Sequence, residues 1–177
     1  MARKRGYMFY CKGADTIVFH HTGSNLKEDN QPQTLLKLHT GNPKEQISFG
    51  GKVTICRGWS DIGYHFFVRK RDIFVGRSLN RSGASVRGHN KNKIAVCVAG
   101  KDYATTSLSF RASKYLIYRI LKEHDKMGEP IDNLTVHRRY ANTECPSFSP
   151  LSDLMYHKKI DDFLGVRVVD RNKWDRA

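Results

Sequence analysis

The sequence predicts a mixed α/β fold, a single domain with a central mixed β-sheet flanked by helices. Residues 94–98 are apolar throughout, as expected for a strand that is covered on both faces. Other strand-like runs alternate along the chain with helical patterns, and such interleaving places helices on the faces of a sheet. The length of 177 residues matches one domain and is enough to bury a core without disulfides.

Strands are predicted where apolar and β-branched residues recur. In chain order these are an edge strand around residues 7–10, a core strand at 15–21, a strand ending at 68, a partner strand at 73–75, and strands at 94–98 and 134–137. Arg71 and Asp72 are predicted to form the turn between the third and fourth of these strands. Residues 44–57 contain Gly50-Gly51 before a β-branched run and predict a hairpin or a flap.

Three helices are predicted. The first runs from Pro32 to about His39 and stops at the sequence Gly-Asn-Pro of residues 41–43. The second starts at Ser109, a suitable N-cap residue, and continues to about Lys126. A third is expected at about 150–163. On these helices, His39 and His124 are expected to face solvent.

The net charge of +14 indicates attraction to polyanions, such as anionic envelope polymers. No motif of a nucleic-acid-binding module is present. The basic residues of 1–14 suggest an N-terminal arm before a main domain at 15–177. The four cysteines form no closely spaced framework, which indicates a reducing compartment without a required disulfide. No apolar run approaches 18 residues, so no transmembrane helix is expected, and no secretion signal is recognised.

Two strand ends and one loop carry a possible metal site. His20 ends one apolar strand, His137 ends another, and Cys145 follows eight residues after His137 in a polar loop. Imidazole and thiolate are ligands that Zn²⁺ prefers, and three protein ligands with one open position are typical of a catalytic zinc. The alternative is that the histidines merely leave the core and the cysteine is a small buried hydrophobe.

Four blocks in one order resemble the zinc-dependent N-acetylmuramoyl-L-alanine amidases of the type 2 family, which includes peptidoglycan recognition proteins and small phage lysozymes (endolysins). They span most of the chain: Val18-Phe19-His20-His21-Thr22, Gly58-Trp59-Ser60-Asp61-Ile62-Gly63-Tyr64-His65-Phe66, Gly88-His89-Asn90-Lys91-Asn92-Lys93-Ile94-Ala95-Val96-Cys97-Val98, and His137 through Cys145-Pro146-Ser147-Phe148. The phage lysozyme branch is the most similar, since no wall-binding domain is appended. Residues 40–57 are longer than in the phage pattern.

The resemblance implies a role for each matching residue. His20, His137 and Cys145 would bind one Zn²⁺. Tyr64 would be the catalytic tyrosine, and Thr143 would be a catalytic hydrogen-bond donor. Ser85 and Lys93 depart from the family pattern at positions expected near the substrate.

Substrate contacts are expected from a loop and a strand. Arg87 and His89 lie in the loop that should border the groove. His65 is the third candidate, although it could equally be a core residue behind the site.

Three functions remain open at this point. The first is a zinc amidase that cuts between N-acetylmuramic acid and the L-alanine of the stem peptide during phage-induced lysis. It would act as a monomer, waiting in the host cytoplasm until the membrane is permeabilised and then reaching the periplasm and cell wall. The second is a binder of peptidoglycan or protein, or a dual-role enzyme that also regulates the phage RNA polymerase. The third is a thiol hydrolase using Cys145 with His137, which a chelator would not inhibit.

Overall fold

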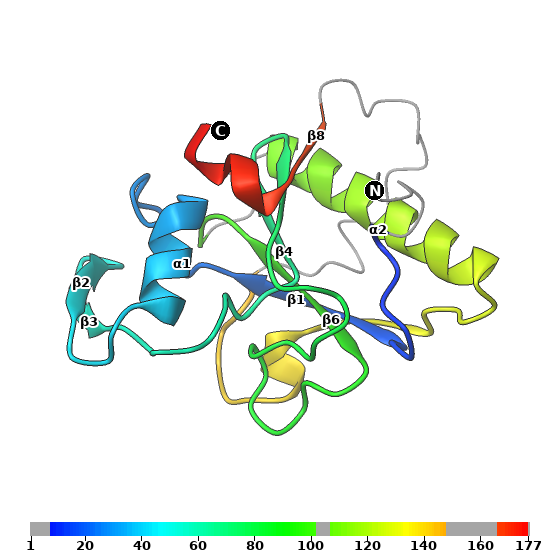
Figure 1. Cartoon of the computed structure of the whole chain (residues 1–177), viewed down its shortest axis with the longest axis horizontal. Coiled ribbons are helices and arrows are strands. Elements are labelled where there is room, and N and C mark those ends of the chain that lie inside the picture. The colour runs from blue at the N-terminus through cyan, green and yellow to red at the C-terminus, as the bar shows by residue number, and fades with distance from the viewer. Residues whose placement is uncertain (1–7, 102–106, 148–165, 177) are drawn as a thin grey trace.

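The computed structural model describes residues 8–101, 107–147 and 166–176 (Figure 1). Its helices and strands are, in order, β1 (Thr16–His21), α1 (Pro32–Thr40), β2 (Gln46–Phe49), β3 (Lys52–Ile55), β4 (Phe66–Arg69), β5 (Asp72–Val75), β6 (Lys93–Val98), α2 (Ser107–Lys126), β7 (Asn133–Val136), the 3₁₀ helix η3 (His137–Arg139), β8 (Arg167–Val169) and the 3₁₀ helix η4 (Arg171–Arg176). The predicted helix at 150–163 lies outside the described residues.

The central sheet has six strands in the order β7-β1-β6-β4-β5-β8. β7, β1, β6 and β4 run parallel to one another, β5 is antiparallel to β4, and β8 is parallel to β5. The prediction of a mixed α/β fold around a central mixed sheet is therefore confirmed. The carboxyl ends of β1, which includes His20, and of β7, which directly precedes His137, lie side by side at one end of the sheet.

The strands alternate their side chains between two cores. Phe66 and Val68 of β4 face α2, where they pack with Leu116 and Ile120. Phe67, between them, faces the opposite core. That second core also holds Leu35 of α1, Ile62 of the loop before β4, Phe74 of β5, Cys97 of β6 and Trp174 of η4. The helices α1 and α2 thus cover opposite faces of the sheet, and Figure 1 shows them on either side of it.

The start of α2 differs from the prediction. The helix begins at Ser107, so Ser109 is an internal residue and not the N-cap. Its hydroxyl instead accepts a hydrogen bond of 2.8 Å from the backbone N–H of Lys70. Lys70 has a φ of +53° because the β4–β5 turn is made by Lys70 and Arg71, one residue earlier than predicted. A serine that resembles a cap therefore stabilises a distant turn.

Two helical histidines are buried, which makes the prediction of solvent exposure wrong for both. His39 is 4% exposed and His124 is fully buried. Nε2 of His124 accepts a hydrogen bond from Cys11 N–H at 3.1 Å, and its Nδ1 lies 2.8 Å from the Glu129 carbonyl oxygen. The ring thus joins the N-terminal segment to the end of α2, a contact between residues far apart in sequence.

The segment before β1 packs as an irregular chain. Residues 8–10 form turn and coil, so the expected edge strand is wrong for them; Tyr7 lies outside the described residues. Phe9 is 1% exposed in the core facing α2, and its N–H donates to the Glu123 carboxylate at 2.9 Å. Residues 8–14 are therefore part of the packed domain.

The β2–β3 pair is an antiparallel hairpin, as one of the two sequence alternatives predicted. It lies beside α1 and away from the central sheet (Figure 1). Val53 and Ile55 on β3 are 72% and 58% exposed.

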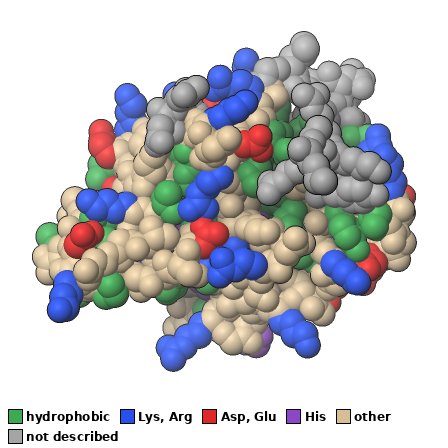
Figure 2. Space-filling model, in the orientation of Figure 1, with side chains coloured by type: hydrophobic (Ala, Val, Ile, Leu, Met, Phe, Trp, Pro, Cys, Tyr) green, Lys and Arg blue, Asp and Glu red, His purple; other side chains and the backbone are tan. Residues whose placement is uncertain are grey.

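On the face drawn in Figure 2, Lys and Arg side chains are scattered over the surface of the molecule. The described part of the chain contains no helix that could span a lipid bilayer.

Candidate metal centre

His20 and His137 are brought together by the pairing of two parallel strands. Phe19 of β1 is in register with Val136 of β7, and each histidine is the next residue along its strand direction. The two imidazole rings lie 4.7 Å apart between centroids. Strand alternation directs His20 away from the α2 core, which receives Ile17 and Phe19. Sheet register therefore places two imidazoles at one point.

The loop after η3 returns Cys145 to the same point. Cys145 Sγ lies 4.0 Å from His20 Nδ1, and the ligand atoms of His20, His137 and Cys145 all lie within 4.8 Å of one another. We call these three residues the metal centre. Cys145 is followed by a cis peptide bond to Pro146. Three residues separated by up to 125 positions thus present two nitrogens and one sulfur to a small volume.

Backbone contacts fix the cysteine loop. Arg138 donates its N–H to the Cys145 carbonyl at 2.8 Å, and its guanidinium donates to the Pro146 carbonyl. Thr143 Oγ1 accepts from Cys145 N–H at 3.2 Å, and His21 N–H donates to Cys145 Sγ at 3.3 Å. No pattern in the sequence indicates these roles of Arg138 and of the His21 backbone. Together they hold the sulfur toward the end of β1.

The environment sets the charge of each candidate ligand. Burial lowers the pKa of His20 well below its ordinary value, and the neighbouring His137 adds to that shift. Burial also lowers the pKa of His137. Both imidazoles are therefore neutral at pH 7, the form that binds metal. Burial raises the pKa of the Cys145 thiol to about 11, so the sulfur keeps its proton until a cation replaces it.

The donor set fits Zn²⁺. Nε2 of His20 is buried and has no hydrogen-bond partner within the part of the chain that the structure describes. A buried polar nitrogen without a partner is costly, and a metal bond would satisfy it. Two imidazoles and one thiolate match the preferences of zinc, whereas Mg²⁺ and Ca²⁺ prefer oxygen ligands. His20, His137 and Cys145 are thus the residues that could hold the ion.

Tyr64 stands next to the metal centre. It lies in the coil just before β4, and its ring centroid is 5.2 Å from that of His20. Burial raises the pKa of Tyr64 well above its ordinary value, with smaller contributions from Cys97 and Cys145. The phenol therefore remains protonated at neutral pH and can act as a hydrogen-bond donor.

His39 supports Tyr64, a role that the sequence analysis missed. Its Nδ1 accepts a hydrogen bond from Gly63 N–H at 3.1 Å, one residue before the tyrosine. Its ring stacks on Trp59 at 4.9 Å and lies 5.5 Å from the Tyr64 ring. The sequence did contain an indication that His39 is buried. It follows the buried Leu35 by four residues and so lies on the same face of the helix.

The three predicted substrate contacts have different surroundings. His65 is fully buried, its Nδ1 accepts from Ala95 N–H at 2.9 Å, and its Nε2 lies 2.9 Å from the Arg81 carbonyl oxygen. That environment is structural and leaves the ring no surface for substrate. Arg87 and His89 are exposed, and the His89 ring lies 5.3 Å from Tyr140, which follows η3. The structure thus brings His89 beside the cysteine loop and keeps His65 in the core.

Comparison with known proteins shows what the chain is similar to. A family model described as N-acetylmuramoyl-L-alanine amidase matches residues 12–148. An endolysin of Enterobacteria phage K11 is 38% identical over 95 residues, covering 52% of this chain and 63% of that protein. Peptidoglycan-recognition protein LB of Drosophila melanogaster is 31% identical over 161 residues, covering 86% of this chain and 64% of that protein. The chain thus spans less than two thirds of the length of these two relatives.

A solved structure shares the fold over most of both chains. The N-acetylmuramoyl-L-alanine amidase LysC from Clostridium intestinale URNW superposes with a TM-score of 0.62 at 26% identity, covering 84% of this chain and 85% of that one. The matched family segment, residues 12–148, contains Tyr64 and all three residues of the metal centre.

Proposed function

Because the chain belongs to the N-acetylmuramoyl-L-alanine amidase family, we propose that it is a zinc-dependent hydrolase of peptidoglycan. The bond cut is the amide between N-acetylmuramic acid and the L-alanine of the stem peptide. The observation that carries the proposal is the convergence of the ligand atoms of His20, His137 and Cys145 within 4.8 Å, together with a buried His20 nitrogen that has no hydrogen-bond partner in the described part of the chain.

The roles of the residues follow from their chemistry. Zinc, when bound, supplies a Lewis acid that lowers the pKa of water and polarises a carbonyl. His20 and His137 bind as neutral imidazoles, and Cys145 binds as a thiolate. The phenol of Tyr64 donates a hydrogen bond to the negative charge that develops on the amide oxygen, the role of an oxyanion donor.

Thr143 has a positioning role and can have a catalytic one. Its hydroxyl oxygen accepts from the Cys145 backbone, which holds the cysteine loop in place. The hydroxyl proton remains able to donate to substrate, since accepting one hydrogen bond does not use it. A hydroxyl cannot supply a charge, so its contribution to the rate should be smaller than that of the metal.

A binding-only function is the second candidate, because one relative is a peptidoglycan-recognition protein. A pure binder does not need a third metal ligand, and the thiol of Cys145 lies beside both histidines. The thiol-hydrolase alternative is disfavoured by burial, which raises the Cys145 pKa to about 11 and leaves little nucleophilic thiolate at neutral pH.

The likeness to phage endolysins extends the proposal to host lysis. The enzyme would act on the cell wall once the membrane is permeabilised. Peptidoglycan would then be both its substrate and its binding partner.

The test is clearing of purified peptidoglycan with and without a chelator, followed by added Zn²⁺. Clearing that stops with chelator, returns with zinc, and produces new alanine amino termini without new reducing sugar ends supports the amidase. Clearing that ignores the chelator would indicate the thiol hydrolase. Binding of peptidoglycan without clearing by folded, zinc-loaded protein would indicate the binder.

A further inference from the structure

Arg57 is an exposed arginine near the proposed active site, just after the β2–β3 hairpin. Its guanidinium forms no hydrogen bond or ion pair with any residue that the structure describes. The contact that holds the side chain is with Trp59, since Arg57 Cζ lies 5.0 Å from the centroid of that ring. The cation is therefore kept in place by an aromatic ring while its N–H donors stay open to a ligand.

The backbone around Arg57 is fastened to the last turn of α1. Arg57 N–H donates to the Leu38 carbonyl at 2.9 Å, and Trp59 N–H donates to the His39 carbonyl at 2.7 Å. Gly58 between them has a φ of +66°, a conformation that glycine adopts without strain. These contacts fix the chain where it carries the arginine and the tryptophan.

Ring contacts connect Arg57 to Tyr64, the proposed oxyanion donor. The His39 ring stacks on Trp59 at 4.9 Å between centroids and lies 5.5 Å from the Tyr64 ring. Burial lowers the pKa of His39, and the charge of Arg57 adds to that shift. Burial raises the pKa of Tyr64, and the same charge acts against that shift. The guanidinium is thus within electrostatic reach of the groups next to the metal centre.

Arg77 is the second arginine whose charge acts on His39, but its donors are already used. It is 7% exposed. Its guanidinium donates to the carbonyl oxygens of Ile62, Ser82 and Asp61. Arg77 therefore supports the loop before β4, whereas Arg57 keeps its donors for a ligand.

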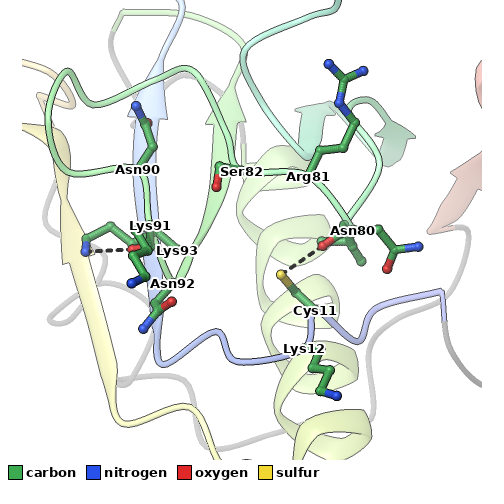
Figure 3. Close-up of a pocket in the computed structure, with 10 residues that line it drawn as sticks. Cys11, Lys12, Asn80, Arg81, Ser82, Asn90, Lys91, Asn92 and Lys93 are labelled. Atoms are coloured by element: carbon green, nitrogen blue, oxygen red, sulfur yellow. Dashed lines mark hydrogen bonds between the residues drawn. The ribbon is translucent and has the colours of Figure 1, made fainter.

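The hollow beside Cys11 does not offer a comparable cation. It lies near the amino ends of β1 and β6, at the other end of these strands from the metal centre. The Arg81 guanidinium donates to the Ser60 hydroxyl at 3.0 Å, and Lys93 Nζ donates to the Lys91 carbonyl at 3.3 Å. Figure 3 shows the Arg81 side chain directed away from the hollow. Its cations are therefore engaged with the protein itself.

We propose that Arg57 determines specificity by binding the free α-carboxylate on the second residue of the stem peptide. The proposal rests on the proposed amidase function, which places the scissile amide beside Tyr64. The second residue, a glutamate, directly follows the alanine whose nitrogen is released. One extended residue spans about 3.3–3.6 Å. The carboxylate thus lies within a few such lengths of Tyr64, a span comparable with the successive ring contacts of 5.5, 4.9 and 5.0 Å that lead to Arg57.

The chemistry of the guanidinium makes this a test of charge and shape. An arginine binds a carboxylate through two parallel charge-assisted hydrogen bonds. An amide in place of the carboxylate has no charge and one acceptor oxygen, so it cannot form the same pair of bonds. Stem peptides with a free carboxylate at this position should therefore bind more tightly than amidated ones.

The test is calorimetric titration of the zinc-loaded Tyr64→Phe protein, in which slow cleavage preserves the ligand. Two ligands are compared, N-acetylmuramoyl-L-alanyl-D-glutamyl-L-lysine and the same compound with the glutamate α-carboxylate amidated. The free acid should bind roughly tenfold more tightly, because the charge-assisted pair forms only with it. The same tenfold preference should appear in the kcat/KM values of the zinc-loaded wild type.

Three further substitutions in the Tyr64→Phe background identify the residue responsible. With Arg57→Gln the two dissociation constants should become equal within about twofold, since the charge is lost. Arg57→Lys keeps the charge without the planar fork and should retain a preference of about threefold. The matched control, Lys126→Gln, removes an exposed cation at the last residue of α2 and should keep the tenfold preference.

Several results would overturn the proposal. A preference that persists with Arg57→Gln would mean that another group binds the carboxylate. An equal loss with Lys126→Gln would mean that only the overall charge matters. Equal affinity for both ligands, or no binding of either, before Arg57 is changed would mean that the carboxylate is not recognised. Failure of the proposed function is distinguishable, because zinc-loaded wild type would then clear no peptidoglycan while the titrations still report on Arg57.

Discussion

His20 and His65 are both buried beside the central sheet, yet their ring nitrogens have opposite surroundings. His65 has both nitrogens within 2.9 Å of backbone partners, Ala95 N–H and the Arg81 carbonyl. His20 has a buried Nε2 with no hydrogen-bond partner among the described residues, and its ring lies against His137 and Cys145. Burial alone therefore does not distinguish a structural histidine from a metal ligand.

The hydrogen-bond inventory of each ring makes the distinction. A ring whose two nitrogens are satisfied by backbone groups contributes to folding and has no remaining capacity for a ligand. A ring that keeps an unpaired nitrogen next to another imidazole and a thiol fits a metal ion. Changes in the metal centre should remove activity, and changes around His65 should remove stability.

The largest effect is expected for Cys145→Ala. Removing the thiolate leaves two imidazoles, so zinc should be lost from the purified protein and peptidoglycan cleavage should fall roughly 10⁴-fold, because activated water is lost with the metal. Metal analysis and alanine amino-terminus release measure the two effects. Cys56→Ala is the matched control, since Cys56 is a buried cysteine outside the metal centre. Zinc content near one ion per chain in Cys145→Ala would refute the assigned ligand set.

Tyr64→Phe should separate catalysis from metal binding. The substitution removes only the phenolic O–H, and loss of one oxyanion donor lowers the rate by roughly 10²–10³. Zinc content should stay at the wild-type level, because Tyr64 is not among the three ligands. A variant that cleaves peptidoglycan at the wild-type rate would show that the ring next to His20 serves packing alone.

His65→Ala should lower the stability of the fold and leave zinc binding unchanged. The change leaves the Ala95 N–H without its buried acceptor and creates a cavity, which together should lower the free energy of unfolding by about 3 kcal/mol. Denaturant titration measures the loss, and metal analysis of the folded fraction should still find zinc. If His65→Ala lost zinc while its free energy of unfolding stayed unchanged, the contrast between His20 and His65 would be wrong.

The pH dependence of stability should report on His39. Burial lowers its pKa to about 4, whereas the unfolded chain has the ordinary value of 6.5. Below pH 6.5 the unfolded state binds the proton first, so this contribution to stability is full above pH 6.5 and is lost as the pH falls toward 4. The total change is roughly 3 kcal/mol.

His39→Asn keeps an acceptor near the position of Nδ1 and removes the titration. Unfolding measured between pH 4 and 7 should show a flatter profile for this variant than for the wild type. Identical slopes in the two proteins would mean that His39 is not held neutral by the fold.

The sequence predicted the elements whose patterns are local. His20 and His137 were recognisable as candidate metal ligands because each lies at the end of an apolar strand. Parallel strands bring their carboxyl ends to the same end of a sheet. Contacts between distant segments were not predictable. The ring of His124 accepts a hydrogen bond from the N–H of Cys11, 113 residues away, and the Ser109 hydroxyl accepts one from Lys70, in a turn 39 residues away.

The most direct measurement is zinc X-ray absorption spectroscopy of the purified, zinc-loaded protein. If His20, His137 and Cys145 bind the ion, the spectrum should show one sulfur at about 2.3 Å and nitrogen or oxygen ligands at about 2.0–2.1 Å. The sulfur shell should disappear in Cys145→Ala reconstituted with excess zinc. A wild-type spectrum without sulfur, or an unchanged sulfur shell in the variant, would contradict the assignment of the metal centre.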